Sequence, residues 1–555
     1  MNPTSIELTN FKAIGEIIVV PIRPITLIFG ANSSGKSSIL QCLSMLAQSV
    51  DIEGLEPCLH SKGDLVDVGT FKDFINGHDI KKSFSCKFNF DMDGKEFFDS
   101  FLSDLQDENR QFRHVSLSKD AQKFKYILTK FKGISLSFRF DYNTENGVIE
   151  GKNVEFFLGD AAVPAFIYDG CKLNAHYEHE FWEYYRKQFS SSLNELFSKK
   201  LKEIEQEISK IDIEDKHTII DQWLDDDSRL KSLLALDSSK NWMAAFDWYL
   251  NDCIDTGHYV TDYSGFLPSH FAHLEPKQYL CAEITEHLGW NTHRSIDQFD
   301  SFHPLQLIVQ VSAQIKSFLG SFKVIGPLRR APERYLITGY ADNNRTRQNG
   351  GNAIMALAYD SELVDTVNWE LEQLQTGYQL KVVRFSAPND DISDIFQLQF
   401  VNQRSGVAAS IRDVGFGFSQ LLPIVIECVR KSWKTCLIEQ PELHLHPALQ
   451  TELGDLFLRA VLNNDQNNYS TKKRCLLIET HSEHLILRIL RRIRETSENS
   501  IDANVTQVVP DQVAVLYVQS GINGSEVVFI PINDEGEFTR LWPQGFFAER
   551  GRELF

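Results

Sequence analysis

Long apolar runs and cysteine frameworks are missing from this sequence. The most apolar N-terminal segment, residues 14–29, is interrupted by Glu16, Pro21, Arg23 and Pro24, so neither a membrane span nor a secretion signal is expected there. The nine cysteines are scattered and form no CxxC pair, which argues against a zinc ribbon or a disulfide-stabilised fold. We therefore expect a cytoplasmic protein with no membrane partner.

Positive charge is also scarce. Lysine and arginine number 56 against 76 aspartates and glutamates, which gives a formal net charge of -20. A field of this sign repels nucleic acid except where basic residues cluster, so generic coating of DNA is disfavoured. Two such clusters occur, at Arg329, Arg330, Arg334, Arg345 and Arg347 and at Arg488, Arg491, Arg492 and Arg494. Each fits either a phosphate-backbone contact or a solvated face with intramolecular ion pairs.

Internal repeats and sustained heptads are absent as well, so a long coiled-coil arm is not expected. What is present is an ordinary globular balance, with 42% hydrophobic and 24% charged residues over a length of 555. That length is typical of three to four domains or subdomains, at about 150 residues each.

Strand and helix patterns are clearest near the two ends of the chain. Strands are predicted at residues 5–9 and 25–29, followed by a helix from Ser37 with apolar residues at helical spacing. Further strands, separated by turn signals such as Asn146-Gly147, predict an antiparallel β subdomain at residues 83–90, 134–140 and 148–158. Residues 160–321 are aromatic-rich with helical spacing, which indicates an inserted helical domain.

The strongest motif runs from Gly30 to Ser37 and matches GxxxxGK[ST] between a predicted strand and a predicted helix. Glycines let the backbone fold around phosphate oxygens, and successive amides at a helix N-terminus bind the anion. Lys36 is expected to reach the β and γ phosphates of ATP, and the Ser37 hydroxyl to ligate Mg²⁺. The predicted nucleotide-binding residues are Gly30, Asn32, Ser33, Ser34, Gly35, Lys36, Ser37 and Ser38.

A P-loop needs a carboxylate at the end of a neighbouring strand. The apolar segment 435–439 ends in Glu439 and continues as Gln440-Pro441-Glu442, which makes Glu439 the predicted magnesium-side carboxylate. A second apolar strand, 475–479, ends just before Thr480-His481.

These motifs together resemble the ABC-type ATPases, in the branch that holds RecF-like, SMC-like and OLD-family heads. The resemblance covers about residues 1–160 and 321–555. It implies an α/β fold, with a P-loop ABC-type ATPase head, an antiparallel β subdomain in 1–160 and a largely helical insertion at 161–320. Residues 321–555 would then complete the head with the signature, Walker B, D-loop, switch histidine and C-terminal tail.

By the same resemblance, the signature lies at Gly415, Gly417, Ser419 and Gln420, the D-loop at His446 and the switch histidine at His481. A helix that starts near residues 419–422 would hold Pro423 in its first turn. In this architecture the signature of a second subunit closes over the γ phosphate, which implies a head-to-tail ATP sandwich dimer. Two surface histidines or a metal pair at His444 and His446, and a core histidine at 481, are the alternatives.

The sequence departs from the family pattern at Gln440, where the water-activating glutamate normally stands. An amide cannot accept the proton, and losing a general base costs about 10² to 10⁴ in rate. ATP would then be held longer than it is hydrolysed, unless a different local turn lets Glu442 act as the base. No glutamine lies between Gln48 and Gln106, so the Q-loop residue stays unassigned.

A finer resemblance rests on Gly326-Pro-Leu-Arg-Arg330, on the segment 439–447 and on the terminal Trp542-Pro-Gln-Gly-Phe-Phe547. These are similar to the PtuA-type ATPases of Septu and retron antiphage systems. That similarity implies a separate HNH-type nuclease as partner and, in retrons, a reverse transcriptase with its DNA–RNA product. The terminal motif fits equally an aromatic tail docked on its own core.

Two functions follow from this reading. The first is a slow ATPase whose dimer controls a partner nuclease in prokaryotic antiphage defence, since no HNH or toprim-like signature is visible in the chain itself. The alternative is a RecF- or SMC-like ATPase head that acts on DNA in recombination or repair. A transporter motor would need a hydrophobic coupling groove, for which there is no signal.

Overall fold

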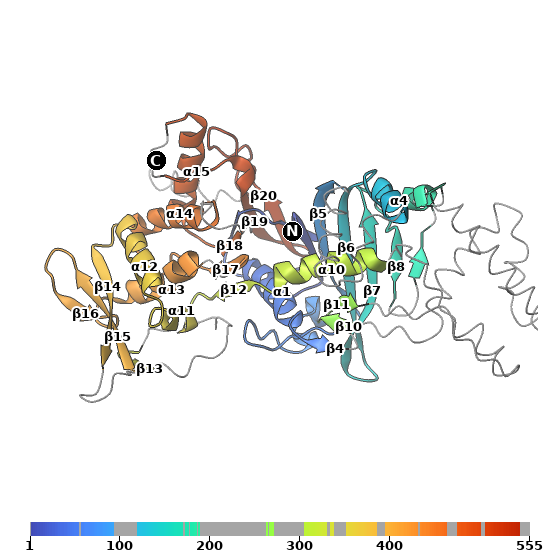
Figure 1. The fold of residues 1–555 in the computed structure, drawn as a ribbon. Helices are drawn as coiled ribbons and strands as arrows, with labels where there is room; N and C mark the ends of the chain where they lie inside the picture. Colours follow the sequence, from blue (N-terminus) through green and yellow to red (C-terminus); the bar gives the residue numbers. More distant parts are fainter. Residues whose placement is uncertain are drawn as a thin grey trace, which may run out of the picture.

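The computed structural model arranges the chain as a central sheet with a large antiparallel sheet on one side and a helical region with a small sheet on the other (Figure 1). It describes residues 2–54, 57–93, 119–169, 173–176, 178–185, 187–188, 262–264, 266–270, 305–329, 333–337, 351–385, 395–430, 433–462, 474–500 and 505–543. Arg330, Arg345 and Arg347 of the first basic cluster, and much of the predicted helical insertion, lie outside these residues.

The central sheet has six strands in the order β12-β17-β18-β3-β19-β20, all parallel except β20. Their bounds are Phe322–Ile325, Thr435–Glu439, Cys475–Glu479, Ile25–Gly30, Val513–Gly521 and Gly524–Phe529 in that order. The inner strands are continuous apolar runs because both faces of the sheet are covered. On one face lies α1 (Lys36–Ser49), and on the other lie α13 (Phe416–Arg430), α14 (Pro447–Leu462) and α15 (Glu483–Ser497).

The register of this sheet aligns the functional segments. Glu439 at the end of β17 is the Cα partner of Glu479 at the end of β18, and Glu479 is the partner of Ile28 on β3. The three strands therefore end at one edge, where the P-loop begins. The strands predicted at 25–29, 435–439 and 475–479 are confirmed.

The antiparallel sheet has seven strands in the order β2-β1-β5-β6-β7-β8-β9. Their bounds are Ile18–Pro21, Ser5–Thr9, Phe84–Asp93, Lys132–Asn143, Val148–Leu158, Phe166–Tyr168 and Leu173–Ala175, and α4 spans Lys119–Leu128. Alternate residues of β6 are buried, as expected for a sheet with one face on the core. The predicted β subdomain is confirmed, and its sheet continues past residue 160 through β8 and β9.

Further described parts of the middle of the chain pack on this N-terminal half. The short strands β4 (Glu53–Gly54), β10 (Asp262–Ser264) and β11 (Leu267–His270) form a three-stranded sheet. Helix α10 (Leu305–Leu319) contacts α1, β6 and β11. Within the described residues, none of the helices has the length and apolar character that a membrane span requires.

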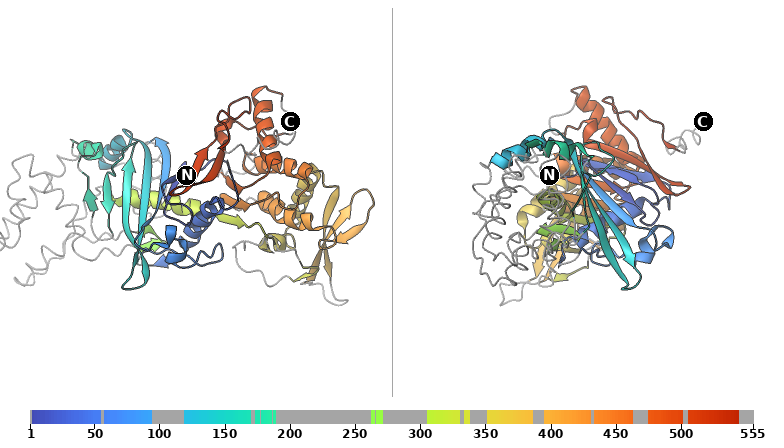
Figure 2. Two further views of the ribbon diagram at one scale, coloured as in Figure 1. Left: turned by 180° about the vertical axis from the view of Figure 1, so that it is seen from behind. Right: turned by 90° about the vertical axis from the view of Figure 1, so that its right-hand side faces the viewer.

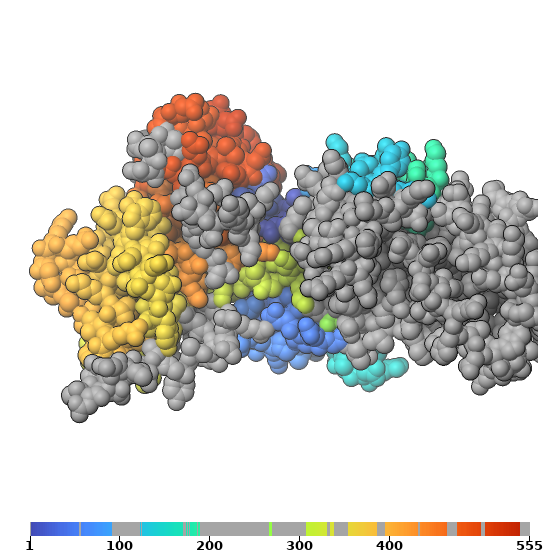
Figure 3. Space-filling model, viewed as in Figure 1, coloured from blue at the N-terminus to red at the C-terminus, as the bar shows by residue number. Residues whose placement is uncertain are grey.

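The far end of the molecule consists of helices and a four-stranded sheet that follow α10 in sequence. The elements are β13 (Leu336–Ile337), α11 (Gly351–Ala356), α12 (Ser361–Gln373), β14 (Tyr378–Phe385), β15 (Ile395–Asn402) and β16 (Ala408–Ser410). Figure 2 shows this region opposite the antiparallel sheet, and in Figure 3 its yellow and orange atoms form one end of the surface. Short turns of helix complete the described fold: α2 (Phe71–Phe74), η1 (Asn76–His78) and η3 (Pro510–Gln512).

One predicted helix boundary is wrong. Helix α13 begins at Phe416, directly after Gly415 with φ +103°, so Pro423 lies inside the helix and not in its first turn. A proline there has no N–H to donate to the carbonyl four residues earlier, and it is tolerated only with local adjustment. The left-handed backbone of Gly415, which glycine adopts without strain, lets the helix begin at Phe416, before the start expected near residues 419–422.

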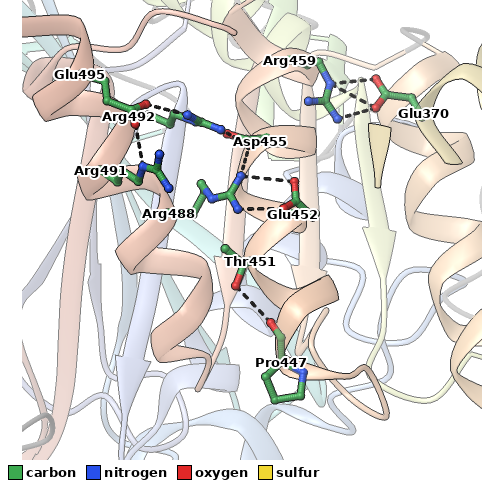
Figure 4. A network of polar contacts seen from close by, with 10 residues as sticks. All are labelled: Glu370, Pro447, Thr451, Glu452, Asp455, Arg459, Arg488, Arg491, Arg492 and Glu495. Atoms are coloured by element: carbon green, nitrogen blue, oxygen red, sulfur yellow. Dashed lines mark hydrogen bonds and ion pairs between the residues drawn. The ribbon is translucent and has the colours of Figure 1, made fainter. Parts of the chain in front are cut away.

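An ion-pair network joins α14 to α15 (Figure 4). Arg488 pairs with Glu452 at 2.8 Å and also with Asp455, which in turn accepts from Arg492 at 2.7 Å. Arg491 and Arg492 both pair with Glu495, each at 2.6 Å. These three arginines of the second basic cluster therefore make intramolecular ion pairs, in agreement with the simpler of the two interpretations.

We predict that Asp455→Asn lowers the free energy of unfolding at pH 7 by about 2 to 3 kcal/mol, because Asp455 is buried between two arginines. Burial alone would raise the pKa of Asp455, but hydrogen bonds and charges from Arg492 and Arg488 lower it overall. The carboxylate therefore stabilises the fold above the unfolded pKa of about 3.9, and this stabilisation is lost as pH falls through the lower folded pKa.

Urea unfolding at neutral and acidic pH measures this difference, with Arg491→Gln as the exposed control, expected to cost less than about 1 kcal/mol. A wild type and an Asp455→Asn variant of equal stability at pH 7 would contradict the expectation.

Candidate nucleotide-binding site

The P-loop, residues 30–37, connects β3 to α1 and is packed too closely for side chains at its glycines. Gly30 (φ +150°) and Gly35 (φ +102°) adopt backbone conformations that favour glycine. A Cβ atom at Gly35 would lie 2.1 Å from Ser525 Oγ, and that hydroxyl donates to the Ser34 carbonyl at 2.6 Å. The β19–β20 hairpin therefore supports the loop from outside.

The side chains of Lys36 and Ser37 make different contacts: Lys36 binds the loop backbone, and Ser37 binds the carboxylate of Glu479. Lys36 is buried, and its Nζ donates to the carbonyl oxygens of Gly30 at 3.0 Å and Ala31 at 2.8 Å. Burial lowers the pKa of Lys36, while the charges of Glu479 and Glu442 act in the opposite direction. Ser37 Oγ donates to Glu479 Oε2 at 2.9 Å, which joins the first turn of α1 to the end of β18.

A pocket of about 300 Å³ opens beside these groups. It is lined by Ala13, Asn32, Ser33, Gly35, Lys36, Ser37, Ser38, Gln41, Gln440 and Glu479. The structure thus brings six of the eight predicted P-loop residues together with Gln440 at this pocket, while Gly30 and Ser34 do not line it. Gln41 and Glu479 were missed, although Gln41 follows Ser37 by one helical turn and Glu479 ends a strand that the sequence did predict.

The carboxylates at this edge have altered acidities. Burial, and then the charge of Glu479, raise the pKa of Glu439 to about 7, against an opposing effect of Arg329. Burial also raises the pKa of Glu442, whose two oxygens accept from the His481 amide at 2.6 Å and from the Thr480 hydroxyl at 2.8 Å. Glu442 therefore fastens the turn after β17 to the turn after β18.

Gln440 occupies a left-handed backbone conformation, with φ +44°. Its amide N–H donates to the Glu479 carbonyl at 2.7 Å, which continues the pairing of β17 and β18 by one residue. This turn places Gln440 at the pocket wall.

Arg329 is not on the surface, although the sequence placed it in a basic cluster. Its side chain donates to the carbonyl oxygens of Glu439 at 2.7 Å and Gln440 at 3.3 Å, and burial lowers its pKa to about 10. The Arg329 backbone exchanges two hydrogen bonds with the Gln420 side chain, at 3.2 and 2.7 Å. The interpretation of Arg329 as a surface phosphate contact is wrong, because the side chain is buried and its terminal nitrogens donate to carbonyl groups of the chain itself.

The predicted signature lies apart from this pocket in the same chain. Ser419 is buried and its hydroxyl donates to the Phe416 carbonyl at 2.6 Å, while Gly415 and Phe416 are exposed. A Cβ atom at Gly417 would lie 2.8 Å from the His444 carbonyl, so α13 packs directly on the turn after β17. Among the described residues that line the pocket, none comes from the signature.

The histidines differ in environment. His446 is exposed, and its Nδ1 accepts from the Ala448 amide at 3.3 Å at the start of α14. His481 is half-buried, and burial and the nearby charge of Lys36 lower its pKa. The ring of His444 contacts Phe416 edge to face, with ring centres 4.8 Å apart.

These residues fit a nucleoside triphosphate with its divalent cation. Lys36 and the loop amides supply positive charge and donors for phosphate, and the buried Ser34 hydroxyl has no hydrogen-bond partner among the described residues. Mg²⁺ prefers oxygen ligands from one or two carboxylates together with phosphates. Among the described residues no three His, Cys, Asp or Glu side chains are grouped so that they could hold a metal ion.

The C-terminal tail docks on the central sheet. Trp542 lies edge to face with Phe29, Tyr517 and Phe538, at ring-centre distances of 5.3, 5.8 and 5.1 Å. The interpretation as a docked aromatic tail is confirmed for Trp542, while Gly545 and Phe547 lie outside the described residues.

Comparison with known families decides the assignment. The model of the family described as "AAA domain, putative AbiEii toxin, Type IV TA system" matches residues 25–488. The chain belongs to this family. The AAA-type ATPase domain thus includes the P-loop, the predicted signature segment and the ends of β17 and β18. A second model, described as a protein of unknown function (DUF3696), matches residues 508–555, which hold the supporting hairpin and the tail.

Solved structures similar to this AAA-type ATPase include SMC heads. The Smc head domain of Pyrococcus furiosus, with an extended coiled coil and bound to the C-terminal domain of ScpA, has 11% identity and a TM-score of 0.34, with 96% of each chain covered. The SMC head domain of Thermotoga maritima has 8% identity and a TM-score of 0.34, covering 96% of this chain and 100% of its own. Similarity at this level carries no inference about function. No protein of curated function matches the sequence.

We predict that Arg329→Met lowers the free energy of unfolding by about 3 kcal/mol, because it leaves the carbonyl oxygens of Glu439 and Gln440 without their buried donor. The matched control is Arg334→Met, which removes a half-exposed ion pair with Asp413 and is expected to cost below about 1 kcal/mol. Chemical unfolding followed by circular dichroism measures both, and equal losses would show that Arg329 has no special structural role.

Proposed function

We propose that this AAA-type ATPase binds ATP with Mg²⁺, hydrolyses it slowly and forms a head-to-tail dimer with ATP between the two copies. In this proposal the ATP-bound dimer controls a partner nuclease of the HNH type in prokaryotic antiphage defence, as in Septu or retron systems. In a retron, the assembly would include a reverse transcriptase and its DNA–RNA product.

The observation that carries the proposal is the identity of the side chains beside the phosphate site. Gln440 lines the pocket and offers an amide, which cannot take a proton from water. Both oxygens of Glu442, the replacement base considered from the sequence, accept hydrogen bonds from Thr480 and His481. This arrangement supports slow turnover and a signal given by ATP occupancy.

The dimer is supported by the separation of the two half-sites. Lys36 and the P-loop line the pocket, whereas the exposed Gly415 and Phe416 lie at the N-terminus of α13, where backbone amides favour an anion. A second copy, turned head to tail, would bring those amides to the nucleotide. His446 and His481 would then act at the D-loop and switch positions.

The distribution of charge favours a protein partner over direct action on DNA. The net charge is -20, and Arg488, Arg491 and Arg492 are engaged in intramolecular ion pairs. These observations weigh against the second candidate, a DNA-loading head for recombination or repair. That candidate requires tight duplex binding by the isolated chain that weakens steeply with salt.

A pull-down of the tagged chain from its native cells tests the partner. We expect an HNH-type nuclease with the wild type and much less of it with Lys36→Ala, because the ammonium that reaches the phosphates is gone. Lys72→Ala removes an exposed lysine on α2 and is the control, expected to match the wild type. Absence of such a nuclease, or its equal recovery with Lys36→Ala, would contradict control by nucleotide.

We further predict that Gln440→Glu raises steady-state phosphate release by about 10²-fold or more, because it restores a proton acceptor beside the phosphates. Gln41→Glu adds the same charge to another wall of the pocket and is expected to give no such rise. If the wild type already turned over at about 10 s⁻¹, the ordinary value for an enzyme, or if Gln440→Glu were no faster, slow hydrolysis through Gln440 would be excluded.

A further inference from the structure

Glu479 occupies a position that the family motifs leave without a role. It is the last residue of β18, the strand that directly neighbours the P-loop strand β3, and its Cα partner there is Ile28, two residues before Gly30. The residue is 3% exposed, and it lines the nucleotide pocket. Burying a charged carboxylate here costs free energy unless a cation or hydrogen-bond donors lie beside it.

A hydrogen bond shows that the Glu479 carboxylate lies beside Ser37 of the P-loop. Ser37 Oγ donates to Glu479 Oε2 at 2.9 Å, and Ser37 is the P-loop hydroxyl that ligates the cation in proteins with this motif. A hydroxyl that binds a cation through an oxygen lone pair keeps its proton, so it can donate to a carboxylate at the same time. Acceptors of this kind orient metal ligands and raise the affinity of the site.

The two other carboxylates at this edge are placed less directly. Glu439 lies one strand further from β3 and is not among the described residues that line the pocket. Glu442 is held by Thr480 and His481. Of these three carboxylates, Glu479 is therefore the one that both lines the pocket and accepts a hydrogen bond from Ser37.

We propose that Glu479, together with Ser37, forms the protein side of the divalent-cation site that accompanies ATP. Its carboxylate orients the Ser37 hydroxyl and places negative charge beside the cation, with Glu439 behind it in the sheet. This inference rests on the proposed function. It assigns the carboxylate beside the cation to Glu479 at the end of β18, the strand next to β3, and not to Glu439 at the end of β17.

Mn²⁺ binding in the presence of a non-hydrolysable ATP analogue, followed by the electron paramagnetic resonance signal of free Mn²⁺, tests the proposal on the full chain. Glu479→Gln is expected to weaken Mn²⁺ binding by about 10- to 100-fold, the usual effect of losing an outer-shell carboxylate. Glu479→Asp keeps the charge and is expected to retain most of the affinity. In EDTA, Glu479→Gln is expected to bind the analogue as tightly as the wild type or more so, because a negative charge near the phosphates has been removed.

Three results would overturn the inference. Mn²⁺ affinity unchanged in Glu479→Gln would do so, as would equal losses in Glu479→Gln and Glu479→Asp. The third is a loss of analogue binding by Glu479→Gln in EDTA that is as large as its loss of Mn²⁺ binding, which would indicate a general disturbance of the pocket. If Glu479→Gln does not fold, as judged by thermal unfolding, Glu479→Asp decides the matter: the inference requires Mn²⁺ affinity close to that of the wild type, and a loss of about 10-fold or more would overturn it. A wild type that binds no analogue with or without metal would instead refute the proposed function.

Discussion

The parallel register of β3, β18 and β17 is the constraint on which the site depends. It ends three strands at one edge and so brings Glu479 and Glu439 side by side next to the P-loop. Burial raises the pKa of both carboxyl groups, and a neighbouring carboxylate adds to it, Glu479 in the case of Glu439 and Glu442 in the case of Glu479. Lys36, Ser37 and Arg329 offset this cost, and Lys36 and Ser37 also line the pocket in which we propose that phosphate and cation bind.

Arg329 connects this edge to the surface expected to meet a second copy. Its side chain holds the carbonyl oxygens of Glu439 and Gln440, and its backbone is bound by Gln420 on α13. Helix α13 also packs against the turn after β17 through Gly417. A shift of that turn would therefore be passed to the N-terminus of α13, which gives a physical route from the nucleotide pocket to the proposed dimer contact.

Sequence patterns within short segments predicted the elements whose structure depends on neighbouring residues in the sequence. The P-loop, the strands around it and the antiparallel sheet follow from glycine spacing, continuous apolar runs and alternation. The buried Arg329, the Ser37–Glu479 hydrogen bond and the tied carboxylate of Glu442 depend on contacts between distant segments, Ser37 and Glu479 being 442 residues apart. The start of α13 at Phe416 depends on the backbone conformation of Gly415, which the expected start near residues 419–422 did not take into account.

The central claim is that ATP bound at one P-loop is completed by the signature of a second copy. A cryo-EM or crystal structure of the full chain with Mg²⁺ and a non-hydrolysable ATP analogue tests it most directly. The account predicts a head-to-tail pair with the nucleotide between Lys36 of one copy and the Gly415–Phe416 amides of the other. A saturated complex in which the nucleotide faces solvent in every copy, or in which the pocket at Lys36 holds none, would contradict it.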